Sequence, residues 1–404
     1  MMIKFDFDTF RKQNITDEEL NQFDNIDNEI NVFFDQYKNY MGWYHIDKLF
    51  NNQIMEDINA TGSYIKDNCD AFIVVGIGGS YLGSQAVIEA LNDYYYNQKK
   101  SPKIYYLGTS LSSQQYNDFI DLIKEKEIII NVISKSGTTL ETTITYELLL
   151  KFMKEKYNPE ELKNRVIITT DNDDNPLKED ARKYGFKSFI IPSDIGGRYS
   201  VFTPAGLLPI RVSDFDLKKL YDGAKEACNN INNQIKYAII RHLMYKKGKT
   251  IEAFVIYEPK LNSFVEWLKQ LYAESLGKEE KGILPIGLSN TKDLHSMGQY
   301  IQEGSKIVFE TIIKTNSNNN MMIDKYNKTL DQINDIACLS TAAAHLEAGV
   351  LNNIITIETI NEKTIGYLMQ FFMISCAISG YIEGVNPFDQ EGVNNYKTKI
   401  EELL

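Results

Sequence analysis

Short apolar runs alternate with amphipathic segments from residue 71 onward, and this alternation limits the possible folds more than any other feature. The runs are rich in β-branched or aromatic residues, and helical patterns lie between them. Strands that are apolar along their whole length are buried on both faces, which is typical of a parallel sheet covered by helices. In the first series, strands are predicted at 71–75, 103–107, 128–133, 166–168 and 188–191, with helices at 82–96, 113–126 and 139–156.

A second series follows a long helical segment at 217–247. Its predicted strands lie at 251–257, 283–286, 306–309 and 353–357, and its predicted helices at 261–277 and 329–349. A chain of 404 residues is expected to form about two to three domains. The pattern therefore predicts an α/β protein with two doubly wound αβα sandwich domains. We assign 1–68 to a helical N-terminal extension, 69–212 to the first domain, 213–385 to the second and 386–404 to a C-terminal segment.

Residues 132–141 form the clearest candidate for a binding site. An apolar run ends at Ile133, a hydroxyl-rich turn follows, and a helical pattern begins at Thr138 or Thr139. The N–H groups of a first helical turn have no partners within the helix, and the helix dipole favours an anion there. The turn predicts a phosphate site, although an ordinary helix cap is the alternative. Its possible donors are Ser134, Lys135, Ser136, Thr138 and Thr139.

A glycine-rich turn at 75–83 also stands between a predicted strand and a predicted helix. It differs from a dinucleotide-binding turn, because Tyr81 occupies the position of the third glycine and no acidic residue ends the next strand. We therefore do not predict a nicotinamide cofactor. Gly79 and Ser80 still let a ligand approach the backbone closely. Since ligands bind at the carboxyl ends of strands in open parallel sheets, this turn and residues 134–139 could hold one ligand together.

Two further segments carry candidate residues. Arg198 follows two glycines, so a permanent cation with directional donors stands where the backbone leaves room for an oxyanion. A surface salt bridge is the alternative. On a predicted helix, Gln270 and Glu274 are four residues apart and share a face with Trp267 and Leu271 as neighbours. Apolar surroundings would raise the basicity of this carboxylate, but most helix glutamates are solvated, and this stretch alone favours that interpretation.

Composition and motif searches argue against several classes of protein. The net charge is −12 without a block of basic residues, which argues against non-specific binding to nucleic acids or membrane surfaces. The four histidines are not spaced as metal ligands, and no G-x-S-x-G motif is present, so neither a histidine-bound metal nor a hydrolase nucleophile elbow is indicated. The widely spaced cysteines indicate buried, reduced thiols of a cytosolic protein. They are Cys69, Cys228, Cys338 and Cys376.

Residues 364–382 contain no charged side chain and are numerous enough to span a bilayer. Acidic residues flank this stretch, and no cluster of Lys or Arg marks a cytoplasmic side. A helix buried in a large α/β core has the same composition. We therefore predict a core helix here rather than a membrane span.

Taken together, these segments resemble the phosphoglucose isomerase family in its shorter bacterial form. The resemblance implies a cofactor-independent isomerase that interconverts glucose 6-phosphate and fructose 6-phosphate in glycolysis and gluconeogenesis. It also implies two domains of the sugar-isomerase (SIS) type, a cytoplasmic location and a homodimer. The matching stretches appear in family order from about residue 40 to the end, at 42–43, 76–83, 134–142, 196–204, 270–277, 295 and 386–397.

The resemblance also implies roles for individual residues. Glu274 is similar to the base that moves a proton between C2 and C1, and Arg198 to the cation that stabilises the enediolate. His295 and Lys397 resemble the ring-opening residues, with His295 reaching across from the partner subunit. Contacts with the phosphate are implied for Ser80, Ser134, Lys135, Ser136 and Thr139, and contacts with the sugar for Gln270 and Gln390.

The chain departs from the longer members of the family by lacking much of their N-terminal region, which leaves the details of the oligomer open. Two alternatives also remain. A non-catalytic sugar-phosphate sensor could use the same domains, but it would not need Glu274, His295 or Lys397. An isomerase that also accepts mannose 6-phosphate, or prefers another hexose phosphate, is not distinguished by the sequence.

Overall fold

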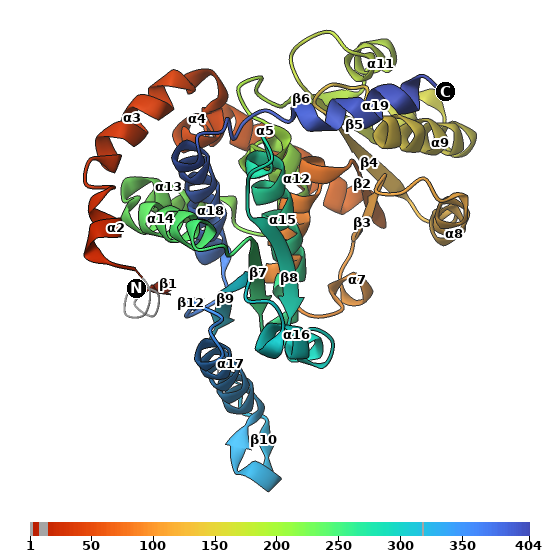
Figure 1. The fold of residues 1–404 in the computed structure, drawn as a ribbon. Coiled ribbons are helices and arrows are strands. Elements are labelled where there is room, and N and C mark those ends of the chain that lie inside the picture. Colours follow the sequence, from red (N-terminus) through yellow and green to blue (C-terminus); the bar gives the residue numbers. More distant parts are fainter. Residues whose placement is uncertain (1–2, 8–14, 317–318) are drawn as a thin grey trace. The chain divides into compact units, whose positions relative to one another are not determined.

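The computed structural model describes residues 3–7, 15–316 and 319–404, and they form two compact units (Figure 1). Unit 1 comprises Met1–Lys38 and Asp222–Leu404, and unit 2 comprises Asn39–Tyr221. These bounds differ from the predicted domains, because the expected N-terminal extension is divided between the units. Strand β1 (Ile3–Asp6) pairs with a strand of unit 1, whereas α5 (Asn52–Asn68) packs on a helix of unit 2.

Unit 2 is built on a parallel sheet with strand order β3-β2-β4-β5-β6. Every residue of β2 and β4 is buried, as their nearly continuous apolar sequence predicts; Asn131 is the one polar residue in them. The chain runs from β2 to β3 on one side and then returns to β4 on the other side of β2, so a topological switch point lies between β2 and β4. The strands are β2 (Ala71–Val75), β3 (Lys103–Leu107), β4 (Ile128–Ile133), β5 (Val166–Thr170) and β6 (Lys187–Ile190).

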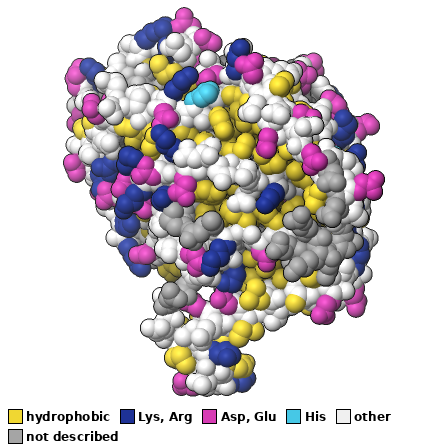
Figure 2. All heavy atoms as spheres, turned by 90° about the vertical axis from the view of Figure 1, so that its left-hand side faces the viewer, with side chains coloured by type: hydrophobic (Ala, Val, Ile, Leu, Met, Phe, Trp, Pro, Cys, Tyr) yellow, Lys and Arg dark blue, Asp and Glu magenta, His cyan; other side chains and the backbone are white. Residues whose placement is uncertain are grey.

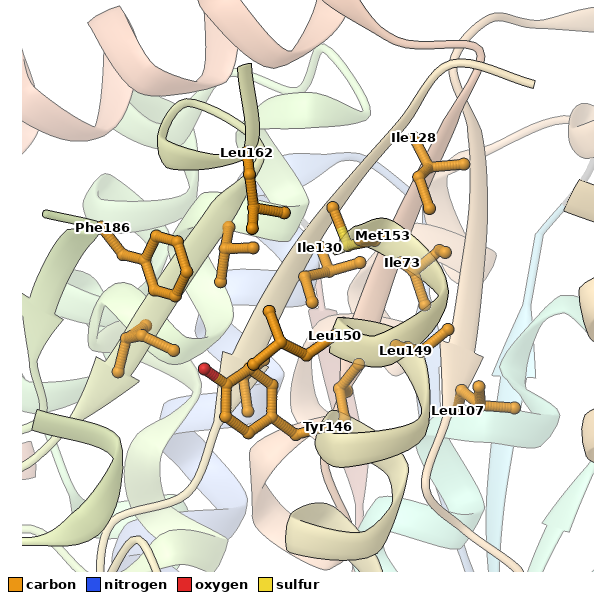
Figure 3. Close-up of a cluster of buried hydrophobic side chains, with 14 of the residues drawn as sticks. Ile73, Leu107, Ile128, Ile130, Tyr146, Leu149, Leu150, Met153, Leu162 and Phe186 are labelled. Atoms are coloured by element: carbon orange, nitrogen blue, oxygen red, sulfur yellow. The ribbon is translucent and has the colours of Figure 1, made fainter. Parts of the chain in front are cut away.

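Helices cover both faces of this sheet. On one face, α9 (Leu140–Lys156) lays Tyr146, Leu149, Leu150 and Met153 on the strands (Figure 3). Their spacing is that of one helix face, and each fully buried side chain of this size contributes about 1.5–3 kcal/mol. The opposite face of β2 buries Phe72 and Val74. The other helices of the unit include α5, α6 (Leu82–Leu91), α8 (Ser113–Ile123), α10 (Pro159–Lys163), α11 (Pro176–Tyr184) and α12 (Pro204–Val212).

Unit 1 has a sheet of order β1-β12-β9-β7-β8, in which only β1 is antiparallel to its neighbour. Its strands β7 (Ile251–Ile256), β8 (Leu284–Ser289), β9 (Val308–Thr315) and β12 (Asn352–Ile357) lie close to the predicted positions, although β9 extends further than expected. The prediction of one helix at 217–247 is wrong, because α13 (Leu217–Asn229) and α14 (Asn232–Lys246) are separate. The remaining longer helices are α3 (Ile26–Gln36), α15 (Asn262–Leu276), α17 (Leu330–Glu347), α18 (Glu362–Glu383) and α19 (Asn394–Glu401).

The charge-free stretch forms most of α18, which is the one helix among the described residues that is long and apolar enough to cross a membrane. However, 83% of its apolar window is buried, and the helix packs against α14 and α15 within unit 1. A core helix of a large α/β unit has this environment, as the sequence predicts.

A short hairpin precedes α17 and consists of β10 (Met322–Ile323) and β11 (Lys328–Thr329). The hairpin and the first half of α17 extend beyond the sheet of unit 1, and we call residues 319–347 the arm (Figure 1). Apolar side chains reach the surface of the arm, which forms the lowest part of the view in Figure 2. The most exposed are Met321, Met322, Tyr326, Leu330, Ile336 and Leu339.

The cysteine prediction holds for three of the four residues. Cys69, Cys338 and Cys376 are buried, whereas Cys228 is only partly buried, and all four are free thiols. Burial raises the pKa of Cys69 and of Cys338 to about 12. These two thiols are therefore protonated, and hence weak nucleophiles, at neutral pH.

A buried ion pair fixes α14 to the sheet of unit 1. Arg241 donates from Nε to Glu252 Oε2 at 2.7 Å, and its guanidinium lies 4.2 Å from the ring centre of Tyr272 on α15. Glu252 Oε1 accepts from the hydroxyls of Tyr237 at 2.5 Å and Thr311 at 2.7 Å. Burial alone would lower the pKa of Arg241, but the Glu252 carboxylate outweighs this effect and the pKa lies above its ordinary value.

We predict that Arg241→Met lowers the free energy of unfolding by about 3–5 kcal/mol, because Glu252 would stay buried without its cation. Lys246→Met, at an exposed position of the same helix, should change it by no more than about 0.5 kcal/mol. Urea unfolding followed by circular dichroism would compare the variants. Similar unfolding midpoints for both would contradict a stabilising role of the pair.

Candidate active site

The turn after β4 is held together by its own hydroxyl groups. Ser134 Oγ lies 3.2 Å from Thr139 Oγ1 and accepts a hydrogen bond from the Gly137 N–H at 3.1 Å. Ser136 Oγ accepts from the Thr138 N–H at 3.3 Å and from the Thr138 hydroxyl at 3.1 Å. The hydroxyl side chains at 134, 136, 138 and 139 therefore belong to one compact turn rather than being separate surface groups.

Helix α9 begins at Leu140, directly after this turn, with Thr139 as its N-cap residue. The Thr139 side chain makes no capping hydrogen bond to the described helix residues, so the simple cap that the sequence left open is not what forms. The N–H groups of the first turn point toward the carboxyl edge of the sheet, where they can bind an anion.

The 3₁₀ helix η3 (Gly78–Ser80) brings Gly79 and Ser80 to the end of the neighbouring strand β2. A Cβ atom on Gly76 would lie 2.7 Å from Ser80 Cβ and 3.0 Å from the Ile133 carbonyl oxygen. Ser80 therefore lies beside the end of β4, where the hydroxyl-rich turn starts. The two turns lie side by side at the switch point of the sheet, and we call residues 79–80 and 134–139 the cradle.

A second 3₁₀ helix, η4 (Gly197–Phe202), brings Arg198 to the same edge. A Cβ atom on Gly79 would overlap the carbonyl group of Gly197, so the two glycine backbones are in direct contact. Ser200 Oγ donates to the Gly197 carbonyl at 2.7 Å and also to the Gly79 carbonyl at 3.3 Å. Arg198 is only 2% exposed, which rules out the surface salt bridge considered from the sequence.

Arg198 is supported by residues that the sequence did not mark as part of the site. The ring of Tyr199 stacks on Trp43 with 4.9 Å between ring centres, and both rings are buried. The Gly42 N–H donates to the Asp194 carbonyl at 3.3 Å, which joins the early segment to the loop before Arg198. No local pattern could have indicated this pairing, because Trp43 and Tyr199 lie far apart in the sequence.

The ammonium group of Lys135 makes hydrogen bonds within the protein, in addition to carrying a positive charge. Its Nζ donates to the carbonyl oxygens of Ser193 at 2.8 Å and Ile195 at 3.0 Å. Burial lowers the pKa of Lys135, although the carboxylates of Asp171 and Asp194 act in the opposite direction. Lys135 thus braces the cradle against the segment that leads to Arg198, in addition to placing a cation near an anionic ligand.

In unit 1, α15 presents Gln270 and Glu274 on one face. Gln270 Nε2 donates to Glu274 Oε2 at 2.9 Å, and both side chains are half-buried beside the buried Trp267 and Leu271. Gln270 Oε1 is buried and accepts no hydrogen bond within the described part of the chain. This acceptor suits a ligand hydroxyl, and the oriented carboxylate suits a general base.

His295 ends the 3₁₀ helix η6 (Lys292–His295), which follows β8. The turn is shaped by Asp293, whose Oδ2 accepts from the Ser289 N–H at 2.7 Å. His295, Gln390 and Lys397 are exposed, and Lys397 lies on α19. Neither His295 nor Lys397 makes a side-chain hydrogen bond or ion pair with another described residue. The described structure also contains no group of three His, Cys, Asp or Glu side chains arranged to hold a metal ion.

Gly137 has a φ of +70°, and a Cβ atom there would overlap the side-chain amide of Asn175. Asn175 cannot easily move, since its Oδ1 accepts from the Lys178 N–H at 3.1 Å and its Nδ2 donates to Thr170 Oγ1 at 3.0 Å. Gly137 is thus a part of the cradle that only its backbone geometry reveals.

We predict that Gly137→Ala weakens binding of inorganic phosphate by about tenfold or more, equivalent to about 1.4 kcal/mol, because the turn must rearrange. Gly185→Ala is a matched control, with a φ of +69° but only the flexible Lys163 side chain nearby. Both variants should lose about 1–2 kcal/mol of stability from the left-handed backbone. Isothermal titration would separate them, and equal loss of phosphate affinity in both would contradict the assignment.

The phosphoglucose isomerase family model matches residues 46–338 of this chain. A glucose-6-phosphate isomerase from Bacillus cytotoxicus is 42% identical over 389 residues, which cover 90% of this chain and 86% of that protein. Another, from Caldanaerobacter subterraneus subsp. tengcongensis, is 42% identical over 393 residues and covers 91% and 87% of the two chains.

Solved structures show the same fold. A hypothetical protein from Thermus thermophilus has a TM-score of 0.87 at 24% identity, with 99% of both chains covered. A glucose-6-phosphate isomerase from Chlamydia trachomatis has a TM-score of 0.74 at 19% identity, with 86% of this chain and 73% of that chain covered. These likenesses confirm the predicted α/β fold of the sugar-isomerase type. Because the family model and the relatives match most of its length, the chain belongs to the phosphoglucose isomerase family.

Proposed function

We propose that this chain interconverts glucose 6-phosphate and fructose 6-phosphate. The observation that carries the proposal is the direct contact of Gly79 with Gly197, which joins the cradle to the buried Arg198 within unit 2. The cradle can bind the phosphate, whose binding energy orients the sugar although no bond to phosphorus changes. The guanidinium can then stabilise negative charge on an oxygen of the reacting end.

Glu274 is the proposed base of the isomerisation. Its carboxylate removes the proton from C2 of the open-chain aldose, and the electron pair moves to form an enediolate. Arg198 stabilises this oxyanion more than the neutral carbonyl compound, so it lowers the barrier. A proton passes from the C2 hydroxyl of the enediolate to the C1 oxygen, which moves the negative charge to the C2 oxygen. The protonated Glu274 then returns its proton to C1 as the C2 carbonyl forms, which yields the ketose. Gln270 orients the carboxylate through its hydrogen bond at 2.9 Å.

His295 and Lys397 are the proposed ring-opening residues. Opening the ring requires a proton on the ring oxygen and removal of a proton from the neighbouring hydroxyl, so an acid and a base must act together. Gln390 is the proposed second contact with the sugar hydroxyls. A non-catalytic sensor would need none of these groups. A preference for another hexose phosphate is tested by the assay described below.

The proposed setting is glycolysis and gluconeogenesis in the cytoplasm. Four free thiols support a reducing compartment. We propose no cofactor, because the proton transfer and the ring opening use only the side chains named above.

Purified protein should convert fructose 6-phosphate to glucose 6-phosphate in an assay coupled to a dehydrogenase, with the same rate after treatment with a chelator. Glu274→Gln should lower kcat by about 10²–10⁴-fold, the usual contribution of a general base, while phosphate affinity stays unchanged. Parallel assays with mannose 6-phosphate would test the breadth of the substrate range.

Glu266→Gln is the matched control for this experiment. Glu266 lies on the same helix, but it is exposed and pairs with Lys269 at 2.7 Å, so its loss should leave kcat within about twofold. Absence of turnover in the wild-type protein would disprove the proposed function. Equal rates for Glu274→Gln and Glu266→Gln would instead remove Glu274 from its role as the base.

We also propose that the active form is a homodimer in which His295 acts in the partner's site. Two observations support this: His295 is exposed, and the arm carries exposed apolar side chains such as Ile336 and Leu339. Clustered apolar surface of this kind is typical of a protein interface.

Mixing two inactive variants tests this arrangement. Glu274→Gln and His295→Ala subunits, unfolded and refolded together, should regain about a quarter of wild-type activity, since half of randomly formed dimers are hybrids with one intact site. Light scattering would verify the dimer mass. Hybrids that form but remain inactive would show that His295 acts within its own subunit.

A further inference from the structure

We propose that Lys278 is a positioning residue that fixes the C-terminal segment, with Gln390 and Lys397, to the helix that carries Glu274. The inference rests on the proposed function, because it concerns how two groups of proposed active-site residues are held in register. Lys278 follows the end of α15 at Leu276 and is four residues beyond Glu274.

The ammonium group of Lys278 is surrounded by one turn of the C-terminal segment. Nζ donates to the carbonyl oxygens of Asn386 and Asp389, the latter at 2.9 Å, and to Asp389 Oδ1 at 2.6 Å. A lysine ammonium has three donors, and three acceptors of this turn surround it. Its role is thus to bind protein rather than substrate.

The turn is also rigid in itself. Asn386 Nδ2 donates to Asp389 Oδ2 at 2.6 Å, and Asn386 Oδ1 accepts from the Phe388 N–H at 3.0 Å. Each oxygen of Asp389 therefore has a partner, one on Lys278 and one within the turn. Phe388 is buried against Tyr37, with 5.5 Å between the ring centres.

Beyond this turn the chain is mostly exposed to solvent. Gln390 follows Asp389 directly, and every residue of α19, which carries Lys397, is exposed. The position of the proposed ring-opening lysine relative to Glu274 is thus set largely where Lys278 binds the turn. The Lys278 side chain is 15% exposed and that of Asp389 is 40% exposed, so the contact is only partly screened by solvent.

This arrangement separates two effects of losing Lys278. Phosphate binding depends on the cradle in unit 2, which has no residue in this network. Ring opening and sugar contacts depend on the segment that Lys278 holds. Loss of Lys278 should therefore lower turnover and leave phosphate affinity intact.

The test compares Lys278→Met with Lys278→Arg and with Lys281→Met as a matched control. Lys281 lies on the same loop, but its side chain is 43% exposed and, among the described residues, pairs with Glu279 at 3.2 Å. We expect Lys278→Met to lower kcat by about 10–100-fold, the loss caused by a misplacement of about 1 Å, with unchanged affinity for inorganic phosphate. Lys278→Arg should recover part of the rate, and Lys281→Met should match the wild type.

A double-mutant cycle with Lys397→Met distinguishes positioning from a general loss of stability. If Lys278 acts through the C-terminal segment, Lys278→Met should slow a Lys397→Met enzyme by less than about twofold, because the group that it positions is already gone. Asp389→Asn removes one charge but keeps the backbone acceptors of the turn, so it should lower kcat by less than Lys278→Met does. If Lys278→Met does not fold, Asp389→Asn takes its place in the test.

Two results would overturn the inference while the proposed function stands. One is wild-type kcat in Lys278→Met, and the other is a full multiplicative loss in the double variant. A wild-type protein without isomerase activity would overturn the proposed function and this inference together.

Discussion

Both units depend on the same constraint, which is a central strand hydrogen-bonded to parallel neighbours on both sides. β2 lies between β3 and β4, and β7 lies between β8 and β9. Because the chain visits one side and then the other, the loops after the central strand separate at its carboxyl end. In unit 2 this opening is occupied by the cradle. In unit 1 the segment after β7 leads into the start of α15, whereas Gln270 and Glu274 lie in the C-terminal half of that helix, toward the amino ends of the strands. Strand order therefore determines the position of the cradle in unit 2, whereas the position of Glu274 in unit 1 depends on the length of α15.

Local pattern predicted those parts of the structure that are set by neighbours in the sequence. The apolar runs gave the strands of both parallel sheets, and the change from hydroxyl-rich turn to helix gave the start of α9 to within two residues. Strand β1 was missed because its four residues alternate in burial and its pairing with β12 supplies its stability. The break between α13 and α14 was missed although four asparagines, at 229–230 and 232–233, surround Ile231, and such a cluster is typical of a turn.

The features of the candidate site also divide into those set by local sequence and those set by contacts between distant residues. The grouping of Ser134, Ser136 and Thr139 could be predicted because one turn contains them all, and the shared face of Gln270 and Glu274 because helix geometry requires it. The roles of Glu274, Arg198, His295 and Lys397 came from the family resemblance and stay predictions. The contacts of Lys135 with Ser193 and Ile195, and of Trp43 with Tyr199, join residues far apart in the chain. Such contacts depend on tertiary packing, which spacing alone does not contain.

The pairing of β1 with β12 has a consequence for synthesis on the ribosome. Ile3 faces Ile357, so the first strand must wait for almost the whole chain before it finds its partner. Unit 2, by contrast, is one continuous stretch that ends at Tyr221. A nascent chain grows from its amino terminus, so unit 2 can fold while most of unit 1 is not yet made. Closing unit 1 then requires a contact of very long sequence separation, which is slow to form. Until β1 pairs with β12, the edge of β12 is open to pairing with other chains. The protein is therefore most prone to aggregation just before this last step of folding.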